Sequence, residues 1–243
     1  VHETTGFDDS ALAKGESLQD TARVLSGYGD ALVLRHKMEG AAAEFAGASR
    51  VPVFNGGDGT NEHPSQALLD LYTIQRELVG KGRQLDGLKI AMLGDLRNGR
   101  TVHSLSKLLT LFNDVHFVLV SRPDLAMPES ITDLLKAAGH RVTISTELEG
   151  VISDVDIVYS TRLQEERFSD KSIIAAHRGS FALDKSIYTE HCEPNTVIMH
   201  PLPRDSRAQA NELDSDLNEN PNLAIFRQAD NGVLVRMALF KLA

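Results

Sequence analysis

Two His-Pro segments stand far apart in this sequence, and both carry side chains that could bind an anion. The first is EHPSQ at 62–66, and the second is HPLPR at 200–204, directly after the apolar run TVIM. Between them, GDLRNGRT at 94–101 and STRLQ at 160–164 each place an arginine after a predicted strand. Ligands of parallel sheets bind outside the carboxyl ends of the strands. Four strand ends that offer His, Arg and Gln predict a pocket for a small, strongly anionic substrate.

His63 and Gln66 lie one turn apart at the start of a predicted helix, so both side chains can reach one ligand. A histidine donor and a glutamine amide suit a carbonyl or carbamoyl group, because the histidine polarises the oxygen and the glutamine recognises the amino group. His63 has a second interpretation as a polar cap of the helix. The loop NGGDG at 55–59 before it does not match the dinucleotide fingerprint and could be a flexible turn.

Arg100 lies in the first turn of another predicted helix, where a cation opposes the helix dipole. This electrostatic cost favours a functional role for Arg100, such as carboxylate binding. The alternative is that Arg100 is an ordinary surface arginine. Arg162 follows a strand end, with Gln164 close by, and an arginine can grip a carboxylate with two hydrogen bonds. We expect Arg97 to be exposed, His103 to be a core histidine, and 165–167 to form a solvated face.

The turn at 200–203 contains two prolines, which stiffen it and remove backbone donors. Its carbonyl groups are therefore free to accept a hydrogen bond from an amine. A cis peptide before Pro203 fits this turn. Lys14 lies on a loop before a predicted helix, and taken alone it would be a solvent-exposed lysine.

The composition excludes several classes of protein. The 243 residues are 42% hydrophobic and 24% charged, which is ordinary for a globular protein, and the net charge of −9 argues against a nucleic-acid partner. The single cysteine, Cys192, permits neither an intrachain disulfide nor a zinc–thiolate cluster and fits a cytoplasmic protein. No apolar run approaches the roughly 18 residues that span a membrane. The chain starts at Val1 without an initiator methionine, so we expect that it is cut at its start.

Short apolar strands alternate with amphipathic helices, which predicts an α/β protein with parallel sheets. Two strands precede the glycine-rich segment at 79–83 and five follow it, so we place a domain boundary there and expect an incomplete first domain. The acidic stretch 211–222 is expected to be a solvated loop with a short helix. The strands are expected at 31–35, 51–54, 88–93, 115–120, 141–145, 155–159 and 196–199, and the clearest helices at 15–26, 64–78, 101–112 and 231–242.

Taken together, the motifs resemble those of aspartate carbamoyltransferase catalytic chains, in the same order and from about Gly6 to the C-terminus. The motifs that carry this resemblance are AKGESL at 13–18, LRH at 34–36, NGGDG at 55–59, HPSQ at 63–66, GDL at 94–96, GRTVHS at 99–104, TRLQ at 161–164, HPLPR at 200–204 and FRQADNG at 226–232.

The resemblance implies two doubly wound parallel-sheet domains joined by the helix that starts near His63. The first, incomplete domain (1–79) would bind carbamoyl phosphate, the second (80–228) aspartate, and the C-terminal helix (229–243) would return to the first. The reaction would need no metal, cofactor or covalent intermediate, and it belongs to pyrimidine biosynthesis. The family's Ser-Thr-Arg-Thr-Arg phosphate-binding motif does not occur in the 243 residues, so we expect that a major part of the carbamoyl phosphate site is missing.

The resemblance also implies a role for individual residues. Carbamoyl phosphate would contact Arg35, His63 and Gln66, and aspartate would be bound by Arg100, Arg162 and Gln164. Thr101, Pro201 and Leu202 would complete the substrate contacts, the last through its backbone carbonyl. Ser10 and Lys14 would enter the active site of a neighbouring subunit, which implies a homotrimer with shared sites. Whether regulatory chains bind is left open by the sequence.

Three alternatives differ in what they require of the sequence. A carbamoyltransferase that uses ornithine would have His-Cys-Leu-Pro at the turn and would lack Arg-x-Gln after the strand. A non-catalytic scaffold that keeps only the trimer surfaces would not need the joint retention of Arg35, His63, Gln66, Arg100 and Arg162. A nicotinamide-binding domain would need the glycine fingerprint, which is absent.

Overall fold

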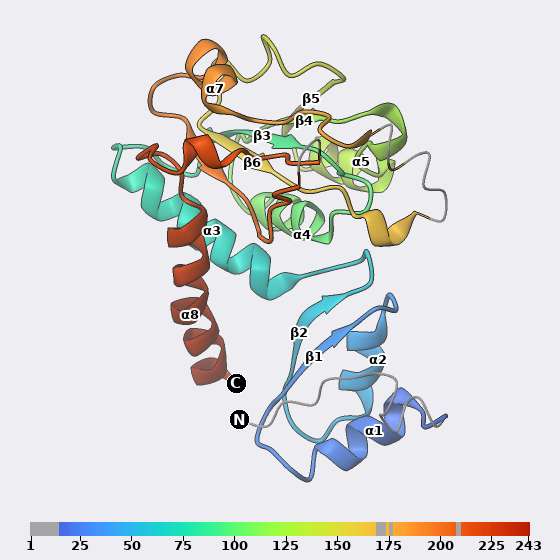
Figure 1. The fold of residues 1–243 in the computed structure, drawn as a ribbon. Helices are drawn as coiled ribbons and strands as arrows, with labels where there is room; N and C mark the ends of the chain where they lie inside the picture. Colours follow the sequence, from blue (N-terminus) through green and yellow to red (C-terminus); the bar gives the residue numbers. More distant parts are fainter. Residues whose placement is uncertain (1–14, 169–173, 175–176, 208–209) are drawn as a thin grey trace.

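The structure is a computed structural model that describes residues 15–168, 174, 177–207 and 210–243. Its larger sheet has five strands, all parallel, in the order β5-β4-β3-β6-β7 (Figure 1). The strands are β3 (Lys89–Leu93), β4 (His116–Val120), β5 (Arg141–Ser145), β6 (Ile157–Ser160) and β7 (Val197–Met199). Each lies within two residues of its predicted bounds. Four of them are largely buried and form apolar runs that stand out in the sequence, whereas the edge strand β5 is largely exposed.

The side chains of successive residues in these strands pack into two separate hydrophobic cores, one on each face of the sheet. On one face, Met92 and Tyr159 pack with residues of α3 (Pro64–Val79), α4 (Arg100–Leu109) and α5 (Glu129–Ala137). On the other, Leu93 and Val158 pack with Tyr188 of α7 (Lys185–His191) and with the segment before the last helix. The sheet is therefore doubly wound, as the sequence predicted.

The chain leaves β3 toward β4 and β5 on one side, and β6 leads to β7 on the other. The switch point between β3 and β6 is where ligands of such sheets bind. Gly94, at the end of β3, has φ +107°, and a Cβ there would lie 2.3 Å from the Thr161 carbonyl oxygen at the end of β6. Only glycine allows the two strand ends to approach this closely.

The smaller sheet has two parallel strands, β1 (Leu32–His36) and β2 (Val53–Asp58), with α1 (Leu18–Leu25) and α2 (Ala41–Ala48) packed beside them. The two-strand count agrees with the prediction. We expected the segment 55–59 to be a loop after the strand. This is wrong, because β2 continues to Asp58. The buried Asp58 carboxylate accepts hydrogen bonds from Asn55 Nδ2 (2.9 Å) and from the Gly40 backbone (3.0 Å), which ties the end of β2 to the start of α2.

Helix α3 joins the two sheets, and α8 (Ile225–Leu242) packs along it (Figure 1). Asn231 Nδ2 of α8 donates to Thr73 Oγ1 of α3 at 3.0 Å. Helix α8 begins at Ile225 rather than at 231 as predicted, because Ile225 and Gln228 are buried and already belong to the helix.

The segment 211–222 contains a short helix, as we predicted, but it is less solvated than we expected. Glu212, Leu213 and Leu217 are buried, and the last of these lies in the 3-10 helix η4 (Ser215–Leu217). Two other short 3-10 helices are η2 (Pro123–Leu125) and η3 (Glu165–Arg167). In the part of the chain that the structure describes, no helix is both long and apolar enough to cross a membrane.

Candidate active site

Cationic side chains from both sheets gather around His63, at the start of α3. The imidazole is 9% exposed, and burial lowers its pKa to about 4, with further lowering by the charges of Arg100, Arg35 and Arg236. His63 is therefore neutral at pH 7 and can donate one N–H to an oxygen. It does not cap its helix with its side chain, so the capping interpretation is wrong. Its backbone N–H donates to Ser104 Oγ at 2.8 Å, which ties the start of α3 to α4.

Arg100 reaches from α4 of the larger sheet to the end of β2 in the smaller one. Its Nη1 donates to the Gly59 carbonyl at 3.0 Å, and Arg167 Nη2 donates to the same oxygen at 2.9 Å. A Cβ at Gly57 would lie 2.8 Å from the Arg100 Cζ, so this glycine makes room for the guanidinium. Burial lowers the pKa of Arg100, and so do the charges of Arg35 and Arg167. Three guanidinium groups in mutual repulsion form a site that favours an anion.

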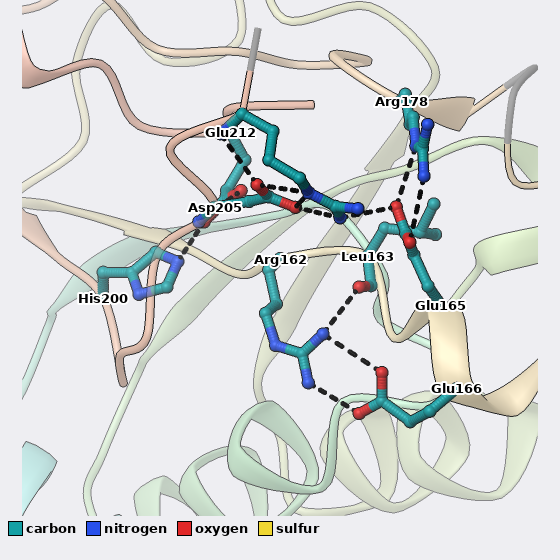
Figure 2. Close-up of polar contacts among 9 residues, drawn as sticks. Arg162, Leu163, Glu165, Glu166, Arg178, His200, Asp205 and Glu212 are labelled. Carbon is teal, nitrogen blue, oxygen red and sulfur yellow. Dashed lines mark hydrogen bonds and ion pairs between the residues drawn. The ribbon is translucent and has the colours of Figure 1, made fainter. Parts of the chain in front are cut away.

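Arg162 lies in the loop that follows β6, and Glu166 holds it with two hydrogen bonds, as Figure 2 shows. The distances are 2.6 Å from Nη2 to Oε1 and 3.1 Å from Nη1 to Oε2. Gln164 is anchored through its backbone N–H, which donates to Asp95 Oδ2 at 3.1 Å. Asp95 is buried after β3, so one carboxylate links the loops at both strand ends of the switch point. Burial raises the pKa of Asp95.

The turn after β7 is held by a buried His–Glu pair (Figure 2). His200 Nε2 lies 2.7 Å from Glu212 Oε1, while its Nδ1 accepts the Leu202 N–H at 2.9 Å. The Leu202–Pro203 peptide is cis, as the sequence analysis predicted, and Leu202 has φ +56°. A leucine in this left-handed region carries strain of order 1 kcal/mol or more, and such strain concentrates at functional sites.

A second buried carboxylate, Asp70, connects this turn to Gln66. Asp70 Oδ1 accepts from Gln66 Nε2 at 2.9 Å and from Gln228 Nε2 at 2.6 Å, and Oδ2 accepts from the Tyr159 hydroxyl at 2.6 Å. Gln228 Oε1 in turn accepts the His200 backbone N–H at 3.0 Å. Thr101 lies in the first turn of α4, next to Arg100.

The structure thus places most of the predicted site residues around the ends of β1, β3, β6 and β7. Ser10 and Lys14 lie outside the described residues. Arg35, exposed on β1, is coupled electrostatically to Arg100 and His63. Arg97 is exposed and His103 is buried, as expected. Glu166 and Arg167 are exposed, as expected for a solvated face, but both also have partners, since Glu166 binds Arg162 and Arg167 donates to the Gly59 carbonyl.

The sequence analysis missed five residues that support this site. The position of Glu166 four residues after Arg162, and the presence of His200 in a turn with two prolines, are signals that could have pointed to a partner. Asp70, Arg167 and Arg236 carry no such local signal. The five are Asp70, Glu166, Arg167, Glu212 and Arg236.

Comparison with known proteins shows which family this chain belongs to. Residues 2–76 match the family model "Aspartate/ornithine carbamoyltransferase, carbamoyl-P binding domain", and residues 86–243 match "Aspartate/ornithine carbamoyltransferase, Asp/Orn binding domain". The "Aspartate carbamoyltransferase catalytic subunit" of Saccharophagus degradans is 69% identical over 242 residues, which cover 100% of this chain and 72% of that protein. The chain belongs to the aspartate carbamoyltransferase catalytic-subunit family.

More distant relatives show the same likeness. The aspartate carbamoyltransferase catalytic subunit of Methanocaldococcus jannaschii is 45% identical over 237 residues, covering 98% of this chain and 74% of that protein. Aspartate transcarbamoylase from Trypanosoma cruzi, solved in complex with carbamoyl phosphate and aspartate, superposes with a TM-score of 0.87 at 34% identity, covering 98% of this chain and 74% of that one.

Proposed function

We propose that this chain transfers the carbamoyl group of carbamoyl phosphate to the amine of L-aspartate, releasing phosphate. The observation that carries this is the buried, neutral His63, whose pKa is lowered first by burial and then by the charges of Arg100, Arg35 and Arg236. Such a site suits a substrate that combines an anionic phosphate with a carbonyl oxygen. The matching family models name carbamoyl phosphate and aspartate or ornithine, and the relative that is 69% identical is named for aspartate.

The chemistry requires only positioning and charge stabilisation. The unprotonated aspartate amine attacks the carbamoyl carbon and forms the new C–N bond. The neutral His63 imidazole and the Arg35 guanidinium stabilise the oxyanion that develops on the carbamoyl oxygen. The bond from carbon to the phosphate oxygen then breaks, and the departing phosphate takes the proton that the amine loses.

Aspartate carries two carboxylates, and the loops at the switch point offer cations for both. Arg162 and Arg100 bind them, with Gln164 and Thr101 beside the substrate. Glu166 accepts two hydrogen bonds from the Arg162 guanidinium and so restricts its orientation. A substrate carboxylate can therefore bind to a guanidinium that is already oriented. The carbonyl groups of Pro201 and Leu202 accept from the attacking amine and from the carbamoyl amino group.

The remaining features are proposed from the resemblance. The chain would act in the cytoplasm as a homotrimer, with Ser10 and Lys14 of one subunit completing the site of the next. Residues 1–79 and 80–228 would form the two substrate domains, and 229–243 would return to the first. A net charge of −9 on the chain makes a lysine from a neighbouring subunit a useful addition to a site for two anions.

The test is formation of carbamoyl aspartate from carbamoyl phosphate and aspartate. Because the Ser-Thr-Arg-Thr-Arg motif does not occur in the 243 residues, we would assay the chain alone and the chain preceded by a segment that carries this motif. Product in either preparation supports the proposal. Absence of product in both, with folded protein, would overturn it in favour of a scaffold, and a scaffold would bind neither aspartate nor a bisubstrate analogue in titration calorimetry.

A further inference from the structure

Asp70 is fully buried in the second turn of α3, and every hydrogen bond at its carboxylate comes from a side chain that leads to the site. Gln66 precedes it by one turn, Tyr159 lies in the buried strand β6, and Gln228 lies in the first turn of α8. Burial raises the pKa of Asp70 to about 6, so the group is mostly ionised at neutral pH and acts only as an acceptor.

An acceptor in this place determines the direction of two amide groups. Gln228 is fixed at both ends, because its Nε2 donates to Asp70 Oδ1 and its Oε1 accepts the His200 backbone N–H. Gln66 shares the same Oδ1, so its NH₂ group must face Asp70. The carbonyl end of the Gln66 amide therefore faces away from Asp70 and stays available as an acceptor.

We propose that Asp70 is a positioning residue that selects a substrate with an amino group by holding the Gln66 carbonyl toward it. This rests on the proposed function, in which Gln66 contacts carbamoyl phosphate. The carbamoyl group carries an NH₂ that can donate to Gln66 Oε1, whereas an acetyl group of the same shape carries a methyl that cannot. An unpaired acceptor disfavours the acetyl compound, so the site distinguishes the two acyl phosphates through one oriented amide.

The experiment compares carbamoyl phosphate with acetyl phosphate as its isosteric competitor. The readout is the inhibition constant of acetyl phosphate divided by the KM of carbamoyl phosphate. In Asp70→Ala the Gln66 amide loses the acceptor that orients it, and we expect this ratio to fall about tenfold, the effect of one hydrogen bond. A purely structural role would weaken both compounds equally and leave the ratio unchanged.

Two matched variants separate orientation from general damage. In Asp70→Asn the new Oδ1 can still accept from both glutamines while its Nδ2 donates to the Tyr159 oxygen, so we expect the ratio to stay within about twofold of wild type. Tyr159→Phe removes the third hydrogen bond without touching either amide and should also keep the ratio. An unchanged ratio in Asp70→Ala, or an equal loss in Tyr159→Phe, would overturn the inference. A wild-type protein that forms no carbamoyl aspartate would instead overturn the proposed function.

A measurement on the wild-type protein covers the case in which Asp70→Ala does not fold. With ¹⁵N-labelled glutamine, the Gln66 side-chain amide is assigned by its absence in Gln66→Glu. We expect its protons to exchange slowly and to stay protected when phosphonoacetamide, a stable amide analogue, is bound, because the NH₂ continues to donate to Asp70. Rapid exchange in the free protein, or a loss of protection on binding, would show that the amide does not have this orientation.

Discussion

Arg162 and Arg97 are two arginines of neighbouring loops with different surroundings. Arg162 is half-buried and held by Glu166, whereas Arg97 is exposed and donates to the Asp124 carbonyl at 3.3 Å. Arg162→Ala should raise the KM for aspartate by 100-fold or more, since a bidentate charged contact contributes about 3 kcal/mol, and should change the KM for carbamoyl phosphate far less. Steady-state kinetics measure both constants. Equal effects on both substrates would remove Arg162 from the aspartate site, and Arg97→Ala, the control, should change neither.

His63 offers a test of the cationic cluster that does not depend on turnover. Burial and three arginines lower its pKa to about 4, so removing one of those charges should raise it. Arg236→Gln should therefore shift the NMR titration of His63 upward, whereas Lys241→Gln on the same helix should not. Binding of inorganic phosphate should raise the pKa further. A His63 that titrates near 6.5 in the wild-type protein would show that the cluster is not assembled.

The same pKa shift has a consequence for stability. Between pH 6.5 and 4 the unfolded chain binds a proton at His63 that the folded chain does not, so the free energy of unfolding falls as the pH falls through this window. The loss is at most roughly 3 kcal/mol, from about 1.4 kcal/mol per pH unit. Urea unfolding at pH 7 and pH 5 should show a smaller loss in His63→Gln. An equal loss in both proteins would contradict the lowered pKa.

At the scale of elements, the close approach of β3 and β6 depends on Gly94. Gly94→Ala would combine a positive φ with a Cβ at 2.3 Å from Thr161 O, and we expect it to destabilise the protein by roughly 3 kcal/mol and to impair aspartate binding. Gly139→Ala is the matched control, since its φ is +85° but no atom lies within 4 Å of the added Cβ. That change should cost about 1 kcal/mol and leave activity intact. Similar losses in both variants would show that the contact with Thr161 is not what requires glycine.

The sequence predicted elements better than it predicted the contacts between them. Apolar runs identified four strands of the larger sheet, because those strands are largely buried on both faces, whereas the edge strand β5 is largely exposed. The segment 55–59 was misjudged because Asn55 and Asp58 pair with Leu34 and His36 of a neighbouring strand, which local composition does not show. Asp70 was missed for the same reason. Its three hydrogen-bond partners come from positions that are 4, 89 and 158 residues away.

For the whole molecule, the proposed trimer makes a prediction that mixing of subunits can test. Lys14→Ala and Arg162→Ala chains should each be nearly inactive, because a site takes Lys14 from one subunit and Arg162 from the next. When equal amounts are dissociated and reassembled together, a site is intact where its own chain carries Arg162 and its neighbour carries Lys14. Random assembly gives this combination at about a quarter of the sites, and the activity should recover to that fraction of wild type.

The control for this mixing experiment uses two residues that we place on the same chain of each site. Arg100 and Arg162 both reach the site from the larger sheet, on α4 and after β6. A mixture of Arg100→Ala and Arg162→Ala chains therefore contains no site with both arginines and should stay inactive. Recovery in this control would show that the two arginines serve sites on different chains. No recovery in the Lys14→Ala and Arg162→Ala mixture, with trimers confirmed by sedimentation, would mean that each site lies within one chain.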